Sequence, residues 1–140
     1  LLLLTNNGSL QARISNPKFK TEKTYWAQVE GTPDKEKLSV LSKSMDLGDF
    51  ITLPAKIRVM EAQETEVLWP RNPPIRIRKT VTDFWLEIKI KEGKNRQVRR
   101  MTAKAGYPGL RLIRASIGSI NLFDINLLPG QWVQADSKLL

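Results

Sequence analysis

The sequence contains no cysteine and no histidine. The absence of cysteine excludes disulfide bonds and thiol chemistry within these 140 residues. The absence of histidine removes the commonest metal ligand and the usual acid–base group near neutral pH. Catalysis by this chain would therefore rest on carboxylate, Tyr, Lys, Arg, Ser or Thr side chains.

Long apolar runs are also missing. No stretch approaches the roughly 18 consecutive apolar residues that a membrane-spanning helix needs. Hydrophobic residues nevertheless make up 41% of the chain, which is enough for a real core at this length. We therefore expect a single domain over residues 1–140, with a reducing cytoplasm as its compartment.

Acidic residues are few compared with basic ones. The chain has 14 Asp and Glu against 23 Lys and Arg, so its formal net charge is +9. This imbalance favours an anionic partner, and nucleic acid is a more common one than a membrane surface. Binding to an anionic membrane is the weaker alternative, because no strongly amphipathic basic helix carries bulky Trp, Phe or Leu side chains on its apolar face.

Hydrophobic periodicity predicts several strands and few helices. Strands are expected over residues 1–4, 25–30, 55–59, 75–78, 84–90 and 110–117. Helices are expected over residues 9–15 with Asn7 as a cap, from Thr32 and Pro33 onward with Thr32 as the cap, and over residues 95–105. Because strands and helices do not alternate as βαβ units, the pattern predicts an α+β fold with a mainly antiparallel sheet.

The helix expected over residues 95–105 has one apolar and one basic side. Val98, Met101, Thr102 and Ala105 fall within about a 100° arc, and Arg99 lies on its flank. No acidic residue occurs over residues 95–114. Guanidinium groups match phosphate geometry, so nucleic-acid contact is favoured over a merely solvated helix face. The basic residues of this region are Lys94, Arg96, Arg99, Arg100, Lys104, Arg111 and Arg114.

Aromatic residues allow two interpretations. Tyr25 could stack on a base, but on composition alone core packing is favoured, because Ala27 and Val29 share its side of the strand. The four tryptophans are more simply explained as core or rim residues. The sequence shows no metal-ligand spacing, no glycine-rich phosphate loop and no Ser/His/Asp set, and none of its aspartates stands out as a nucleophile.

The run Gly93-Lys94-Asn95-Arg96-Gln97-Val98-Arg99-Arg100-Met101 resembles the G-x-N-R-Q-[IV]-R-R-M motif of a known family, the bacterial rRNA pseudouridine synthases of the RsuA/RluB/RluE/RluF group. Lys23-Thr24-Tyr25 resembles the K-x-Y motif of the same family, and residues 106–118 and 128–132 resemble its later motifs. Residues 69–76 are especially similar to the RluE members, which act on one uridine of 23S rRNA.

This resemblance implies a mixed, mainly antiparallel sheet flanked by helices, in a monomer that isomerises a 23S rRNA uridine to pseudouridine without a cofactor or a metal. In the family, a Tyr stacks on the flipped base and a motif Arg pairs with the catalytic Asp, and these roles fall on Tyr25 and Arg99. The remaining basic residues would bind the RNA backbone. They are Lys94, Arg96, Arg100, Lys104, Arg111 and Arg114.

The catalytic Asp of the family is the one part that cannot be assigned. It stands in a G-R-L-D motif a few residues before the segment that Leu1–Leu4 resembles. We therefore expect residues 1–140 to be the catalytic domain without the upstream segment that carries the catalytic Asp. We expect this chain to be inactive by itself. The alternative is a non-catalytic RNA-binding protein or fragment on the same scaffold.

Overall fold

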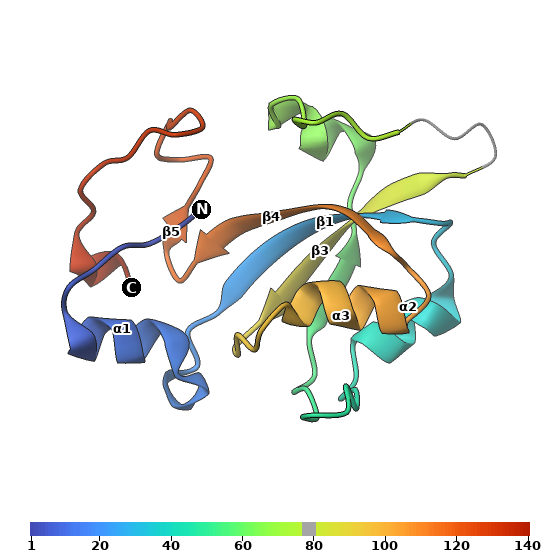
Figure 1. Ribbon diagram of the computed structural model, residues 1–140, viewed down its shortest axis with the longest axis horizontal. Coiled ribbons are helices and arrows are strands. Elements are labelled where there is room, and N and C mark those ends of the chain that lie inside the picture. The colour runs from blue at the N-terminus through green and yellow to red at the C-terminus, as the bar shows by residue number, and fades with distance from the viewer. Residues whose placement is uncertain (77–80) are drawn as a thin grey trace.

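An antiparallel five-stranded sheet organises the chain, with strand order β2-β3-β1-β4-β5. A computed structural model describes residues 1–76 and 81–140 (Figure 1). The strands are β1 Lys23–Glu30, β2 Lys56–Val59, β3 Asp83–Ile90, β4 Gly109–Ile117 and β5 Ile120–Asn121. The α-helices are α1 Gly8–Ser15, α2 Lys35–Leu41 and α3 Gln97–Lys104. Short 3-10 helices are η1 Pro17–Phe19, η2 Ala62–Val67 and η3 Ser137–Leu139. The predicted α+β architecture is confirmed.

The core lies between one face of the sheet and helices α2 and α3. Alternation along β1 turns Ala27 and Val29 to this face, as predicted, and β3 contributes Leu86 and Ile88. Figure 1 shows α2 and α3 together on this side, whereas η2 and the loop after it lie on the other. Helix α1 has no buried residue and lies apart from α2 and α3, near the two chain termini.

The apolar side of α3 is the one that the sequence predicts. Its Val98, Met101 and Thr102 are buried, and Ala105 just after the helix is buried too. The helix begins at Gln97, two residues later than predicted, because Arg96 adopts a left-handed backbone with φ of 52°. Gly106, with φ of +90°, ends the helix as expected.

Three further predicted elements also differ in the structure. Leu1–Leu4 forms no strand, and Leu2 and Leu4 are 71% and 86% exposed. Helix α2 begins at Lys35 rather than after Thr32, because the carboxylate of Asp34 accepts the hydrogen bonds that cap it. The strand predicted over residues 75–78 is not seen at Ile75 and Arg76, and its other half lies outside the described residues.

Tyr107 ties the start of α2 to the end of β1. Its buried hydroxyl donates to the carbonyl of Thr32 (3.0 Å) and accepts from the amide of Asp34 (2.9 Å). We expect Tyr107→Phe to lower the free energy of unfolding by about 1–3 kcal/mol, because a polar backbone group loses its partner. Urea denaturation measures this, and an unchanged midpoint would show that the two bonds add nothing to stability.

Candidate functional site

A cleft of about 410 Å³ opens where β1, β4, α1 and the turn before α3 meet. One aromatic and several basic side chains face it, and no acidic residue lines it within the described chain. The polar and charged part of its lining is Thr5, Gln11, Ser15, Lys23, Tyr25, Lys94, Arg96, Gln97 and Arg114. A cleft with this composition is suited to an anionic ligand that carries a flat, uncharged group.

Tyr25 stands at the junction of core and cleft. It lies opposite Ile88 on β3 and Arg114 on β4, its ring packs against the hydrophobic core, and the residue is half-buried. It also lines the cleft. Core packing of Tyr25 is therefore observed, and because the residue also lines the cleft, its stacking on a base stays a prediction.

Lys23 lines the cleft but was not among the basic residues that the sequence predicted to bind RNA. Lys23 is only 5% exposed. Its side chain forms no ion pair or hydrogen bond among the described residues. Burial lowers the pKa of its ammonium group, the nearby charge of Arg114 lowers it further, and Glu92 opposes these effects. The signal in the sequence was the K-x-Y spacing, which puts Lys23 two residues before Tyr25.

Arg114 joins the cleft to the first residue of the chain. Its Nε donates to the carbonyl oxygen of Leu1 over 3.0 Å. Leu3 and Thr5 line the same cleft. The segment that leads into α1 therefore forms one wall of the site.

The turn before α3 brings Lys94 and Arg96 to the cleft. Gln97 fixes this turn, because its side chain accepts from the amide of Lys94 (3.1 Å) and donates to the buried carboxylate of Glu92 (2.8 Å). Arg99, in contrast, is exposed and does not line the cleft. Its guanidinium has no ion pair or hydrogen bond within the part of the chain that the structure describes.

Two basic residues of α3 form an ion pair or hydrogen bonds with other parts of the chain. The Arg100 guanidinium pairs with the carboxylate of Asp49 and donates to the carbonyl of Leu47. The hydrogen bond from Arg100 holds the pKa of Asp49 below its ordinary value. Lys104 donates to the carbonyl of Asp46. The sequence could not reveal these contacts, because their partners lie more than 50 residues away.

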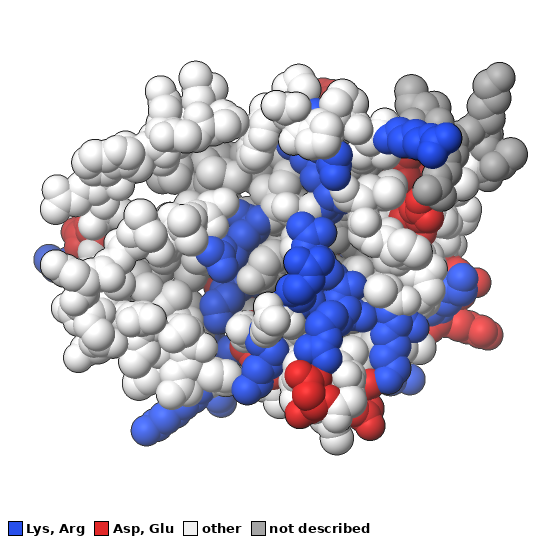
Figure 2. Space-filling view, in the orientation of Figure 1, with Lys and Arg blue, Asp and Glu red and all other residues white. Residues whose placement is uncertain are grey.

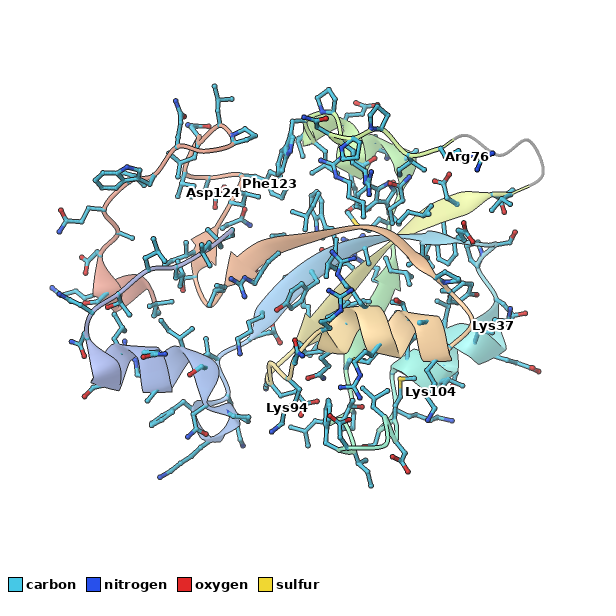
Figure 3. All side chains as sticks on the ribbon, viewed as in Figure 1. Lys37, Arg76, Lys94, Lys104, Phe123 and Asp124 are labelled. Carbon is cyan, nitrogen blue, oxygen red and sulfur yellow. The ribbon has the colours of Figure 1, made fainter. Side chains whose placement is uncertain are left out.

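Among the charged side chains, basic ones nevertheless predominate towards the centre of this face of the molecule. Figure 2 shows Lys and Arg side chains in a band over α3 and in a second group in the hollow beside it, with Asp and Glu mainly around the margin. Figure 3 places Lys94 in the turn before α3 and Lys104 near the other end of the helix. The remaining predicted residue, Arg111, lies in a separate cleft with Trp69.

The described part of the chain contains neither a membrane-spanning helix nor a carboxylate cluster that could hold a metal ion. Among residues 1–76 and 81–140, no helix is long and apolar enough to cross a membrane. Over the same described ranges, no three or more Asp or Glu side chains come together as they would to hold a metal ion.

The chain is similar to known proteins over most of its length. A family model described as RNA pseudouridylate synthase matches residues 1–104. The chain is 52% identical over 138 residues to ribosomal large subunit pseudouridine synthase E of Xanthomonas campestris pv. campestris, covering 99% of this chain and 72% of that protein. It is also 52% identical over 132 residues to the protein of the same name from Vibrio parahaemolyticus, covering 94% of this chain and 53% of that protein.

A solved structure shares the fold. The crystal structure of a pseudouridylate synthase superposes with a TM-score of 0.73 and 25% sequence identity, over 96% of this chain and 50% of that chain. The present chain therefore spans about half of that protein, and between 53% and 72% of the two relatives above.

Proposed function

Because the chain belongs to the RNA pseudouridylate synthase family, we propose that it forms most of the catalytic domain of an enzyme that isomerises one uridine of 23S rRNA to pseudouridine. The observation that carries this proposal is the cleft in which Tyr25 lies among Lys23, Arg96 and Arg114. The name shared by the relatives, ribosomal large subunit pseudouridine synthase E, supports the large-subunit rRNA as substrate. We expect the enzyme to act as a monomer in the cytoplasm.

The reaction explains why an aromatic ring and cations belong together. Uracil must be detached from its ribose, rotated and rejoined through C5, and an enzyme reaches a base for such chemistry by moving it out of the stack. The ring of Tyr25 would stack on the flipped uracil and offset part of the unstacking cost. The basic side chains would hold the phosphates on either side of that nucleotide.

The carboxylate that starts the reaction would reach the cleft from the Leu1 side. In the family, the G-R-L-D motif precedes the segment that Leu1–Leu4 resembles. The hydrogen bond between Arg114 and the Leu1 carbonyl places that segment at the wall of the cleft. A carboxylate arriving there would meet cations, and such an environment keeps it ionised and oriented. From the position of Arg99 in the family motif, we assign it as the partner of this carboxylate. Arg96 and Arg114 line the cleft, whereas Arg99 does not.

Basic residues that line the cleft should contribute more to phosphate binding than those that pair with an acidic residue of the chain. We expect Arg96→Ala to reduce the slope of log K against log salt by roughly 0.7–0.9, the value per neutralised phosphate. Arg100→Ala should reduce it by less, because Asp49 already balances that charge. Titrations of an rRNA transcript at several salt concentrations measure both slopes. Equal slopes for wild type and the Arg96 variant would place the RNA elsewhere.

Tyr25→Ala tests the site directly. We expect the single-turnover rate of pseudouridine formation in a 23S rRNA transcript to fall roughly ten-fold or more, because base–aromatic stacking is lost. Tyr25→Phe is the matched control, since it keeps an aromatic ring that can stack at the same position. An unchanged rate for the Tyr25 variant, with normal folding, would contradict the stacking role.

A further inference from the structure

A second basic site lies on the other face of the sheet. Arg111 of β4 is opposite Gln28 of β1, and both side chains point away from the core that Ala27 and Leu112 face. Arg71 reaches the same place from the loop after η2. Together with Trp69 and Trp85 they line an open cleft of about 380 Å³, which no acidic residue lines within the described chain.

Neutral groups hold both guanidiniums in place. Arg71 donates through Nε to the carbonyl of Leu110 (3.1 Å) and through a second nitrogen to the carbonyl of Pro73. Arg111 donates to the carbonyl of Trp69 (2.8 Å), and its guanidinium lies 5.3 Å from the centre of the Trp69 ring. A guanidinium has five N–H donors, so most of those on both residues remain for a ligand.

The two cations are held near each other, and no carboxylate among the described residues forms an ion pair with either of them. Burial lowers the pKa of Arg111, and the charge of Arg71 lowers it further. The contrast with Arg58 is direct, because that arginine on the same side of the sheet pairs with both Glu64 and Glu87. Two fixed, unneutralised guanidiniums match the geometry of a phosphate group.

We propose that Arg71 and Arg111 together bind a phosphate of the rRNA outside the nucleotide that enters the Tyr25 cleft. This inference rests on the proposed function for the identity of the RNA. Arg111 and Arg114 are about 10 Å apart along β4, but their side chains lie on opposite faces of the sheet. In the described sheet β5 pairs only with Ser116 and Ile117 of β4, so β4 is an edge strand beside Arg111 and one RNA chain can reach both sites by passing round this edge. Trp69 and Trp85 offer flat apolar surfaces to a base next to the bound phosphate. The site would position the RNA rather than read its sequence.

The test measures how tightly the full-length protein binds an unmodified 23S rRNA transcript across a series of salt concentrations. Arg71→Gln and Arg111→Gln each remove one cation. Gln28→Glu leaves both loop anchors in place, gives up the exposed hydrogen bond that Gln28 donates to Asp83, and puts a carboxylate opposite Arg111. Arg58→Gln is the matched control, since it removes an arginine whose charge is already balanced.

We expect the first three variants to bind roughly ten-fold more weakly near physiological salt, with salt slopes reduced by about 0.7–0.9. The control should keep the wild-type slope. Wild-type slopes for Arg71→Gln, Arg111→Gln and Gln28→Glu would overturn the proposal, and so would an equal reduction in the Arg58 control. If an arginine variant unfolds on circular dichroism, Gln28→Glu alone decides the question.

The outcome is separable from that of the proposed function. A wild-type protein that forms no pseudouridine, but whose variants lose slope as expected, would overturn the enzymatic assignment and support this binding site. A wild-type protein that forms pseudouridine, with unchanged slopes in all three variants, would overturn this site alone.

Discussion

The 140-residue chain, prepared by itself, is expected to form no pseudouridine in 23S rRNA. The cleft beside Tyr25 contains Lys23, Lys94, Arg96 and Arg114 but no carboxylate among its described lining residues. The acidic residues near it are already engaged. Glu92 is buried and bonded to Gln97 and to the amide of Leu53. Since the resemblance implies that the reaction begins at an aspartate, we expect none of the described lining residues to start it.

The matched comparison is a protein extended upstream of Leu1 that includes a G-R-L-D motif like that of the family, together with its Asp→Asn variant. We expect activity from the full-length protein, none from the Asn variant and none from the isolated chain. The isolated chain should still bind rRNA, because its basic residues are present. Pseudouridine above background in rRNA treated with the isolated, folded chain would show that the site lies elsewhere or uses another acid.

Arg99→Lys in the full-length enzyme is expected to reduce turnover by roughly ten- to a hundred-fold while changing RNA affinity little. Arg99 is exposed on α3, and the described part of the chain offers its side chain no partner. Lysine keeps the charge but loses the planar fork that holds a carboxylate through two hydrogen bonds. A lost charge-assisted bond costs about 1.5–3 kcal/mol, which gives this range of rates if the bond acts in the transition state.

Single-turnover assays at saturating enzyme separate this role from a phosphate contact. The helix should survive the change, because Arg and Lys have similar helix propensities. Arg96→Lys is the informative comparison, since Arg96 lines the cleft and Arg99 does not. A wild-type rate for Arg99→Lys and a large loss for Arg96→Lys would transfer the pairing role to Arg96.

The sequence predicted the features that depend on local periodicity. The alternation of apolar and polar residues identified β1 and β3. It also identified the buried face of the sheet, on which Ala27 and Leu86 lie. The helical spacing identified Val98 and Met101 as the packed side of α3. These patterns are visible because each residue is placed by its near neighbours along the chain.

Features that depend on distant partners were not predictable. The pairing of Arg100 with Asp49 joins residues 51 positions apart, so the sequence showed a free cation where the structure has an ion pair. The same is true of the approach of Arg71 to Arg111, which a loop and a strand bring together. Leu1–Leu4 was predicted as a buried strand from its composition, but β pairing needs a neighbouring strand that composition cannot reveal.

The most direct test of the proposed function is a pseudouridine map of ribosomal RNA incubated with the full-length protein. Unmodified 23S and 16S transcripts would be treated separately, and each pseudouridine located by chemical labelling and primer extension. We expect one pseudouridine at a single position of 23S rRNA, none in 16S rRNA, and a strongly reduced signal with Tyr25→Ala. Tight binding of 23S rRNA without any pseudouridine, or modification of 16S rRNA alone, would contradict the proposal.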